Sequence, residues 1–511
     1  MKDSRTKNFT RNVIYGLFNK FTSIALPFVS RTIFIQKIGV EYLGLNSLFV
    51  SILQVLNLTE LGFGSALVYS MYKPAIEKDT KTVNYLLNFY RHCYRIIGVI
   101  IAIIGLLICP FVHLLINNSE AINVNFYIIF LIYLLNTVIS YLFFSYKQSL
   151  FIASQRSDIV SNINTASCIL QNSLQIAVLF ISKNYYHYVL VMIVSTLFKN
   201  ILLQLLSKRY YPEYTPSGAI DSKKISNIKK NVRGMFYQKI GSIVLANVDS
   251  IVISAFLGVN ILGIYNNYYY IITSVIGIIG IAMDSLKASV GNSIILESVE
   301  KNYNDFKMIN FMYIWITTWF SVCIGCLLQN FVKLWLGEDL MLDNAITISL
   351  SLYFFIYKWC DITYVYQEAD GLWWQNRFVP LIGAAVNLIL NVILVNIVGL
   401  YGIIFSTIIS LILVNNIGFA IVLFKHYFKN KKWLKQYIIN QVKYLAKYVA
   451  ILTACLIICS FLNDSIESFI LKTIICIILP NVLLFGLNIN NAEFKKSIDF
   501  INRKYLKRRK V

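Results

Sequence analysis

The chain has 511 residues, of which 57% are apolar and 14% charged, against roughly 25% charged in a typical soluble domain. Apolar stretches of about 20 residues recur along it, and each is long enough to cross ~30 Å of hydrocarbon. This composition excludes an ordinary soluble protein. The net charge of +22 alone is typical of nucleic-acid binding, but its distribution along the chain argues against that partner.

The apolar runs are continuous and show no alternation, which indicates helices, because a spanning segment must be helical or part of a closed barrel. We therefore predict an all-α, polytopic membrane protein. The first apolar run is too long for a signal peptide and no small-residue cleavage site follows it, so it is expected to be a span. Fourteen spans are expected, roughly at residues 12–36, 42–71, 91–115, 124–145, 158–182, 186–207, 231–256, 262–287, 308–330, 344–366, 378–396, 400–424, 443–461 and 467–487.

Lys and Arg residues gather on one side of this arrangement. When the N-terminus is placed in the cytoplasm, the inner segments hold 37 of the 46 Lys and Arg residues, and the outer ends hold four. Cytoplasmic loops of membrane proteins are enriched in this way. We therefore expect both termini in the cytoplasm and a basic tail, Lys504 to Lys510, near anionic headgroups. No nucleic-acid partner is expected.

The sequence contains an internal repeat. Shifting the chain by 219 positions aligns forty residues without a gap, and the shared features include an intramembrane Lys and two glycines at equal spacing. Two similar halves in a membrane protein are typical of a transporter whose site lies where the repeats meet. The matched pairs are Asn12 with Asn231, Lys20 with Lys239, Gly39 with Gly258, and Gly44 with Gly263.

Each repeat begins a set of six spans. Because six is even, both sets start in the cytoplasm and should be parallel repeats about an axis along the membrane normal. A linker rich in Lys, Pro and Ser separates them. The expected organisation is a first lobe at 1–207, a linker at 208–230, a second lobe at 231–424, and two extra helices with a basic tail at 425–511.

Ionisable residues within spans are functional candidates, because each costs roughly 2.5–3.5 kcal/mol at mid-helix. Lys20 and Arg31 are eleven residues apart on the first span and point the same way. Lys239 and Asp249 lie on the seventh span, and Glu60 lies on the second. The cations would form the floor of a cavity for an anionic, phosphate-bearing substrate. The alternative for the cations is snorkelling to the headgroups.

Two further patterns have simpler explanations beside the functional one. Tyr265 and Asn267 belong to an aromatic run at the outer end of the eighth span, either an interfacial belt or a contact for sugar hydroxyls. Lys358 and Asp361 are three apart on a helix and are expected to neutralise each other.

The nine cysteines show no metal motif outside apolar helices, where a thiol behaves as a small hydrophobe. No metal, cofactor or catalytic residue is expected.

Four stretches carry a family resemblance. They are Asn12-Val13-Ile14-Tyr15-Gly16, Ile38-Gly39-Val40-Glu41-Tyr42-Leu43-Gly44, Leu58-Thr59-Glu60-Leu61-Gly62-Phe63-Gly64, and Asn247-Val248-Asp249-Ser250-Ile251-Val252-Ile253-Ser254. In these motifs, and over nearly its whole length, the chain resembles the Wzx-type polysaccharide-repeat flippases of the multidrug/oligosaccharidyl-lipid/polysaccharide (MOP) superfamily. The resemblance implies two six-helix lobes in a V in the bacterial inner membrane.

The resemblance also implies an activity. The chain would move an undecaprenyl-pyrophosphate-linked oligosaccharide from the inner to the outer leaflet by alternating access, and would not be an enzyme. Lys20, Arg31 and Lys239 would engage the pyrophosphate. Glu60 and Asp249 would couple transport to protons or sodium ions. Partners would include a polysaccharide polymerase and other export proteins of an O-antigen, capsule or exopolysaccharide pathway.

Other functions are also compatible with the sequence. A cation-coupled exporter of drugs or metabolites has the same fold, although its cationic substrates would favour an acidic cavity. A sugar transporter of the major facilitator type also has two parallel six-span repeats. Such transporters usually have a G-x-x-x-D-R-type motif in the loop after the second span, and this chain has Tyr72 to Asp79 there, without that motif. A membrane polymerase or transferase would need a sizeable outer loop, and all outer loops are short.

Overall fold

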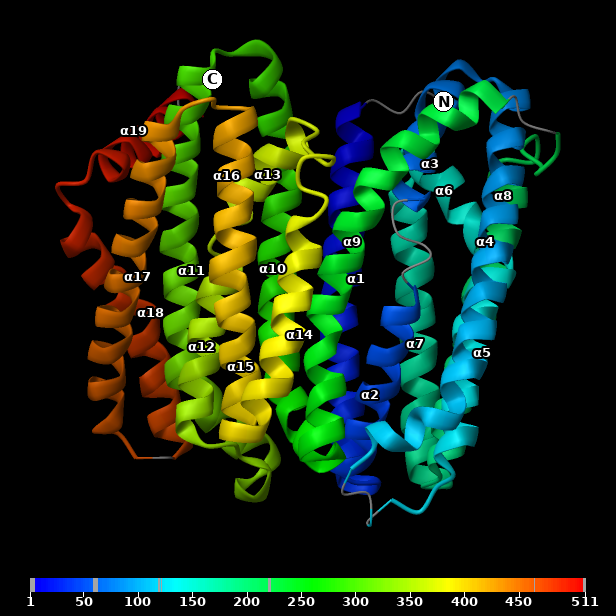
Figure 1. The fold of residues 1–511 in the computed structure, drawn as a ribbon, viewed down its shortest axis with the longest axis horizontal. Helices are drawn as coiled ribbons and strands as arrows, with labels where there is room; N and C mark the ends of the chain where they lie inside the picture. Colours follow the sequence, from blue (N-terminus) through cyan, green and yellow to red (C-terminus); the bar gives the residue numbers. More distant parts are fainter. Residues whose placement is uncertain are drawn as a thin grey trace. The chain divides into compact units, whose positions relative to one another are not determined.

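The computed structural model describes residues 5–57, 63–117, 120, 122–218, 222–463 and 465–508, and within these residues the chain forms helices and no strand (Figure 1). The contacts divide the chain into two compact units, Met1–Asn266 and Asn267–Val511. We refer to them as unit 1 and unit 2. The prediction of an all-α polytopic protein is confirmed.

Unit 1 contains the helices of the first half of the chain and the beginning of α10. They are α1 (Arg5–Lys37), α2 (Val40–Leu56), α3 (Phe63–Glu77), α4 (Thr80–Ile108), η2 (Cys109–Leu115), α5 (Phe126–Leu142), η3 (Phe144–Lys147), α6 (Gln148–Ala153), α7 (Ser157–Ile181), α8 (Tyr185–Tyr210), α9 (Ser222–Leu257) and the first residues of α10 (Val259–Leu296). Within this unit α1 packs along α7, and α2 packs along α9.

Unit 2 contains the rest of α10 and the C-terminal helices. They are α11 (Val299–Leu336), η4 (Glu338–Leu340), α12 (Asn344–Lys358), α13 (Asp361–Ala369), α14 (Val379–Val398), α15 (Leu400–Ser410), η5 (Leu411–Asn416), α16 (Ile417–His426), α17 (Lys431–Ser460), α18 (Ile466–Asn488) and α19 (Ala492–Arg508). The long helix α11 contacts α12, α17, α18 and α19, so it organises this unit.

The helices agree with the predicted spans. In the described part of the chain, twelve helices are long and apolar enough to cross a membrane, and the bent pair Phe126–Leu142 and Phe144–Ala153 adds a thirteenth. The second predicted span falls on α2 and α3, of which α2 is a shorter apolar helix. Large apolar side chains such as Ile181, Ile397 and Phe461 are mostly exposed, as lipid-facing side chains are. The chain is a multi-pass membrane protein.

Polar residues at the helix ends define where the spans begin. The side chain of Asn125 accepts hydrogen bonds from the backbone N–H groups of Tyr127 and Ile128 at the start of α5. Asn184 does the same at α8, and Asn430 does so at α17. An N-cap oxygen satisfies N–H groups that have no partner within the helix. These three Asn residues therefore fix the first turns of α5, α8 and α17.

The repeated turns Gly39 and Gly258 both adopt positive φ, 117° and 98°, where a side chain would be strained. Each turn is followed after five residues by a second glycine, Gly44 or Gly263, at which an added Cβ would lie within 3.0 Å of a backbone carbonyl oxygen. The repeat seen in the sequence thus corresponds to the same turn built twice within unit 1.

The units do not follow the predicted lobe boundaries, because the helix α9, which begins the second repeat, packs on α2 of the first. The two units are defined by contacts between helices, whereas the predicted lobes are defined by the repeat in the sequence. The predicted lobes at 1–207 and 231–424 describe the repeat, and they stay a prediction.

An aromatic cluster forms part of the core of unit 2. The rings of Tyr303 and Trp433 stack with centroids 4.0 Å apart. Phe306 and Phe424 pack against Tyr303, and Tyr437 packs against both of these Phe rings. The cluster joins α11, α16 and α17. Between α15 and α16 the chain forms a π-helical segment, η5, so α16 continues from α15 with a changed register.

Candidate functional site

The helix α1 holds the first two predicted cations. Lys20 and Arg31 are both half-buried. The helix is fixed beside α7 by Asn19, whose amide donates a hydrogen bond to the hydroxyl oxygen of Thr165 at 3.0 Å. Pro27 lies between the two cations and removes one backbone donor from the helix. The two charges therefore lie on a helix that is fixed against its neighbour.

Arg31 is partly used by the protein itself. Its Nη1 donates a hydrogen bond to the backbone oxygen of Asn266 at 2.9 Å, which joins α1 to the beginning of α10. A guanidinium has five N–H donors, and this bond uses one of them. Arg31 thus has a positioning contact in addition to the binding role predicted for it.

The corresponding helix of the second repeat, α9, holds Lys239 and Asp249. Lys239 is exposed, whereas Asp249 is half-buried. Among the described residues, neither the Lys20 nor the Lys239 ammonium group forms an ion pair with a carboxylate. A half-buried Lys in a span without a partner acid is costly, and such residues usually face a polar cavity.

The remaining predicted site residues have different environments. Tyr265 is 5% exposed and Asn267 is fully buried, so contact with a substrate would require helix α10 to move. Their predicted sugar-binding role stays a prediction. Glu60, the second predicted coupling residue, lies outside the described residues. The structure therefore brings Arg31 to α10 and leaves the other predicted contacts untested.

A second group of cations in unit 1 was missed by the sequence analysis. Lys147, in the short helix η3, is 5% exposed. The positive charge of Lys208 on α8 interacts unfavourably with the positive charge of Lys147. Arg91 and Arg95 of α4 act on the neighbouring hydroxyl of Tyr146. In the sequence Lys147 resembled an ordinary loop residue, since it follows the end of a predicted span. Only the bend between α5 and α6 buries it.

Two of the ionic groups in unit 2 involve Lys358 and Lys287. Lys358 pairs with Asp361, as their spacing predicted, and the hydroxyl of Tyr313 donates to the same carboxylate at 2.5 Å. Further along, the ammonium group of Lys287 lies 2.7 Å from Glu368 and 3.2 Å from Asp284. Lys358 is buried, so its pairing offsets the cost of a charge inside the helix bundle.

The arrangement of the helices is that of a known class of membrane protein. The lipid II flippase MurJ in its inward closed conformation superposes with a TM-score of 0.64 and 15% identity, covering 94% of this chain and 99% of that one. A MATE multidrug resistance transporter of the MOP superfamily, in its inward-facing conformation, superposes with a TM-score of 0.61 and 13% identity. The match covers 83% of this chain and 99% of that one. A MOP superfamily transporter from Pyrococcus furiosus superposes with a TM-score of 0.55 and 14% identity, covering 83% of this chain and 97% of that one. The chain has the MOP transporter fold.

The family assignment comes from the sequence. The profile of the family described as polysaccharide biosynthesis protein matches residues 9–286, which is more than half of the chain. This protein belongs to that family. The match covers α1 to α9 and most of α10, so it includes both copies of the repeated turn. No curated protein sequence matches the chain.

Proposed function

We propose that this protein is a flippase for lipid-linked oligosaccharides. It would move undecaprenyl-pyrophosphate-linked repeat units from the inner to the outer leaflet of the bacterial inner membrane by alternating access, for O-antigen, capsule or exopolysaccharide synthesis. The family, a polysaccharide biosynthesis family, and the MOP transporter fold support this function. The observation that carries it is the half-buried Lys20 on α1, which has no partner acid among the described residues.

The chemistry of the substrate explains why such a cation is useful. A pyrophosphate loses its hydration when it enters the membrane, and fixed cations replace the lost interactions with charge-assisted hydrogen bonds. Lys20 and Lys239 would act as point charges, whereas Arg31 would grip two phosphate oxygens with its fork. The polyprenyl chain is apolar and would stay in the lipid. Tyr265 and Asn267 would meet the sugars once α10 moves.

Return of the empty carrier requires an energy source. We assign this role to Asp249 and Glu60, whose protonation or sodium binding would change the charge balance of the transport site. Asp249 is half-buried in α9, where it can exchange with a polar space more easily than a fully buried acid. Both chain termini would lie in the cytoplasm, and a polysaccharide polymerase would use the exported units on the outer side.

The test is complementation. The gene is expressed in a strain that lacks its own flippase but makes the matching lipid-linked unit, and surface polysaccharide is measured at equal membrane levels of protein. The proposal expects polysaccharide to return. Absence of polysaccharide, while an authentic flippase restores it in the same strain, would reject the function. The genes beside this one would indicate which lipid-linked unit to supply.

The MATE-like fold supports a second candidate, a cation-coupled exporter of drugs or metabolites. Drug efflux and drug resistance of cells that express the chain separate the two functions. Efflux of cationic drugs without restoration of polysaccharide would favour the exporter. A polymerase or transferase is separated from both by assaying growth of glycan chains, since a flippase translocates units without extending them.

A further inference from the structure

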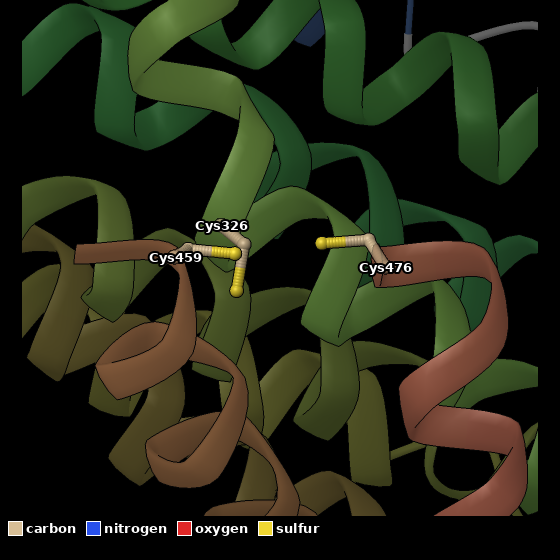
Figure 2. Close-up of side chains that lie close together, drawn as sticks. All are labelled: Cys326, Cys459 and Cys476. Carbon is tan, nitrogen blue, oxygen red and sulfur yellow. The ribbon is translucent and has the colours of Figure 1, made fainter. Parts of the chain in front are cut away.

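Three cysteines from three helices of unit 2 meet at one point. Cys326 is on α11, Cys459 is at the end of α17, and Cys476 is on α18. All three are buried, and their sulfur atoms lie within 4.8 Å of one another. In Figure 2 the side chain of Cys476 points across to the sulfurs of Cys326 and Cys459. The sulfurs therefore converge from helices that are far apart in the sequence.

The spacing suits a shared metal ion. A metal–thiolate bond of ~2.3 Å places the sulfurs of a three-coordinate site about 4 Å apart, so these side chains need to move only slightly. A fourth cysteine, Cys323, lies at the edge of the group, where its thiol donates to the backbone oxygen of Cys476 at 3.6 Å. The Cys323 thiol is therefore engaged by the backbone, and the group of converging sulfurs consists of Cys326, Cys459 and Cys476.

A buried cation lies near one of the three sulfurs. Lys472 precedes Cys476 by one helical turn of α18 and is 5% exposed, and its charge acts on the sulfur of Cys459. Three thiolates around one ion carry excess negative charge, which is costly in a helix bundle. The ammonium group of Lys472 offsets part of this charge.

We propose that Cys326, Cys459 and Cys476 bind one soft, thiophilic metal ion of the Cu⁺ or Zn²⁺ class. Thiolates are the ligands that select these ions. Each thiol that coordinates gives its proton to solvent, because the thiolate is the ligand. The ion does not take part in transport. It ties the two C-terminal helices α17 and α18 to the central helix α11.

Other contacts indicate that this junction is built for a fixed arrangement. The indole N–H of Trp319 on α11 donates to the backbone oxygen of Cys476 at 3.0 Å. The indole of Trp315, one turn earlier, donates to the side-chain oxygen of Asn481 at 2.8 Å. Both bonds hold α18 in register with α11, so Cys476 stays opposite Cys326. A metal ion would complete the junction by including α17.

The experiment uses the full-length protein in detergent. Metal-free protein is titrated under reducing conditions with Cu⁺ or with Zn²⁺, and binding is measured by equilibrium dialysis with metal analysis. One ion per chain is expected. The variants Cys326→Ser, Cys459→Ser and Cys476→Ser should each weaken binding by more than about 100-fold, and Lys472→Met should weaken it by about tenfold. The matched control is Cys360→Ser, since Cys360 is equally buried in unit 2 but outside the group.

A second measurement needs no variant. Wild-type protein is partially unfolded and alkylated with and without metal, and the modified cysteines are identified by mass spectrometry. Protection of Cys326, Cys459 and Cys476 together, without protection of Cys360, supports the site. Failure of both ions to bind, or equal binding by all the variants, overturns it.

Discussion

Gly44 of the first repeat and Gly263 of the second make the same contact with each other's helix. The Cα of Gly44 faces the backbone oxygen of Val259, and the Cα of Gly263 faces the backbone oxygen of Val40. Val40 and Val259 are also equivalent positions in the repeat. The first turns of α2 and α10 therefore approach each other backbone to backbone through a local pseudo-two-fold relation. Only glycine allows so close an approach.

The crossing predicts a strong effect of a single methyl group. Gly44→Ala and Gly263→Ala each place a Cβ within 3.0 Å of a carbonyl oxygen, so the helices must separate. Overpacking of this kind costs about 1–3 kcal/mol. We expect a lower melting temperature for both variants in detergent. Gly16→Ala and Gly280→Ala are the controls, since an added Cβ meets nothing within 4 Å there. Equal stability of all four variants would contradict the close crossing.

The cationic residues predict a graded series of transport defects. Lys20→Arg and Lys239→Arg keep the charge and should retain much of the transport, whereas the Ala and Glu variants should lose most of it. Arg31→Lys should be intermediate, because it keeps the charge but loses the fork that also reaches Asn266. Surface polysaccharide is measured in a strain without its own flippase, at matched membrane levels. Wild-type polysaccharide in Lys20→Ala, Lys239→Ala and the double variant would assign these lysines to the headgroups.

The Lys358–Asp361 pair in unit 2 predicts a stability defect that a second substitution repairs. Asp361→Asn removes the partner of Lys358 and leaves a buried charge, which costs about 3–5 kcal/mol. The double variant Lys358→Met with Asp361→Asn removes both charges, keeps an acceptor for the Tyr313 hydroxyl, and should recover most of the stability. Thermal unfolding in detergent measures both. If the double variant is as unstable as Asp361→Asn, the loss does not come from an unpaired Lys358.

Asp370 predicts a dependence on pH. Burial raises its pKa above the ordinary range, and the charge of Lys429 opposes that rise. Its contribution to stability is therefore present at low pH and is lost as the pH rises through the raised pKa. Asp370→Asn should raise the melting temperature near neutral pH, and the difference from wild type should shrink on acidification toward about pH 4.

The neighbour of Asp370 gives a second check. Burial first, and then the Asp370 charge, raise the pKa of Tyr427 to about 12. In the Asp370→Asn variant the Tyr427 titration should shift downward, measured by tyrosinate absorbance. Asp339→Asn, at an exposed position of η4, is the control and should leave both measurements as in wild type. An unchanged pH profile in Asp370→Asn would show that this carboxyl is not destabilised by burial.

The topology predicts which loops are reachable from outside. Single cysteines introduced at Asn117 and Asn463, in a background without native cysteines, should react with an impermeant maleimide in intact spheroplasts. A cysteine at Pro216, in the linker, should react only after the membrane is opened. Reaction of either outer position only from the cytoplasmic side would reverse the orientation derived from the Lys and Arg distribution.

The sequence was sufficient for those features that depend on local patterns. Apolar run lengths predicted the spans, and a spacing of three on one helix predicted the Lys358–Asp361 pair. The repeat also marks Gly44 and Gly263 as equivalent positions, and the structure brings their backbones close to the facing helices. It also aligned Asn12 with Asn231, and Asn12 proves to bridge α1 to α7 by accepting from the Asp158 N–H at 3.0 Å.

Features that depend on packing between distant segments could not be predicted. The sulfurs of Cys326, Cys459 and Cys476 meet only because α17 and α18 dock on α11 in one register, and no spacing in the sequence gives that register. Burial of Lys147 requires the bend between α5 and α6. The burial of Tyr265 and Asn267 depends in the same way on how α10 packs, so an interfacial position could not be distinguished from a core position.

The π-helical segment η5 constrains how this chain can vary in length. A π turn closes its hydrogen bonds over five residues instead of four, which corresponds to one additional residue in the helix. Its residues are in use, since the Asn416 amide donates to the backbone oxygen of Ile356 and Asn415 lies against Gly383. Deleting one residue here would restore a regular α-helix but turn α16 by about 100°. Phe424 would then leave the aromatic cluster. An alignment with relatives that places a gap in this stretch would therefore assign the wrong face of α16 to the core.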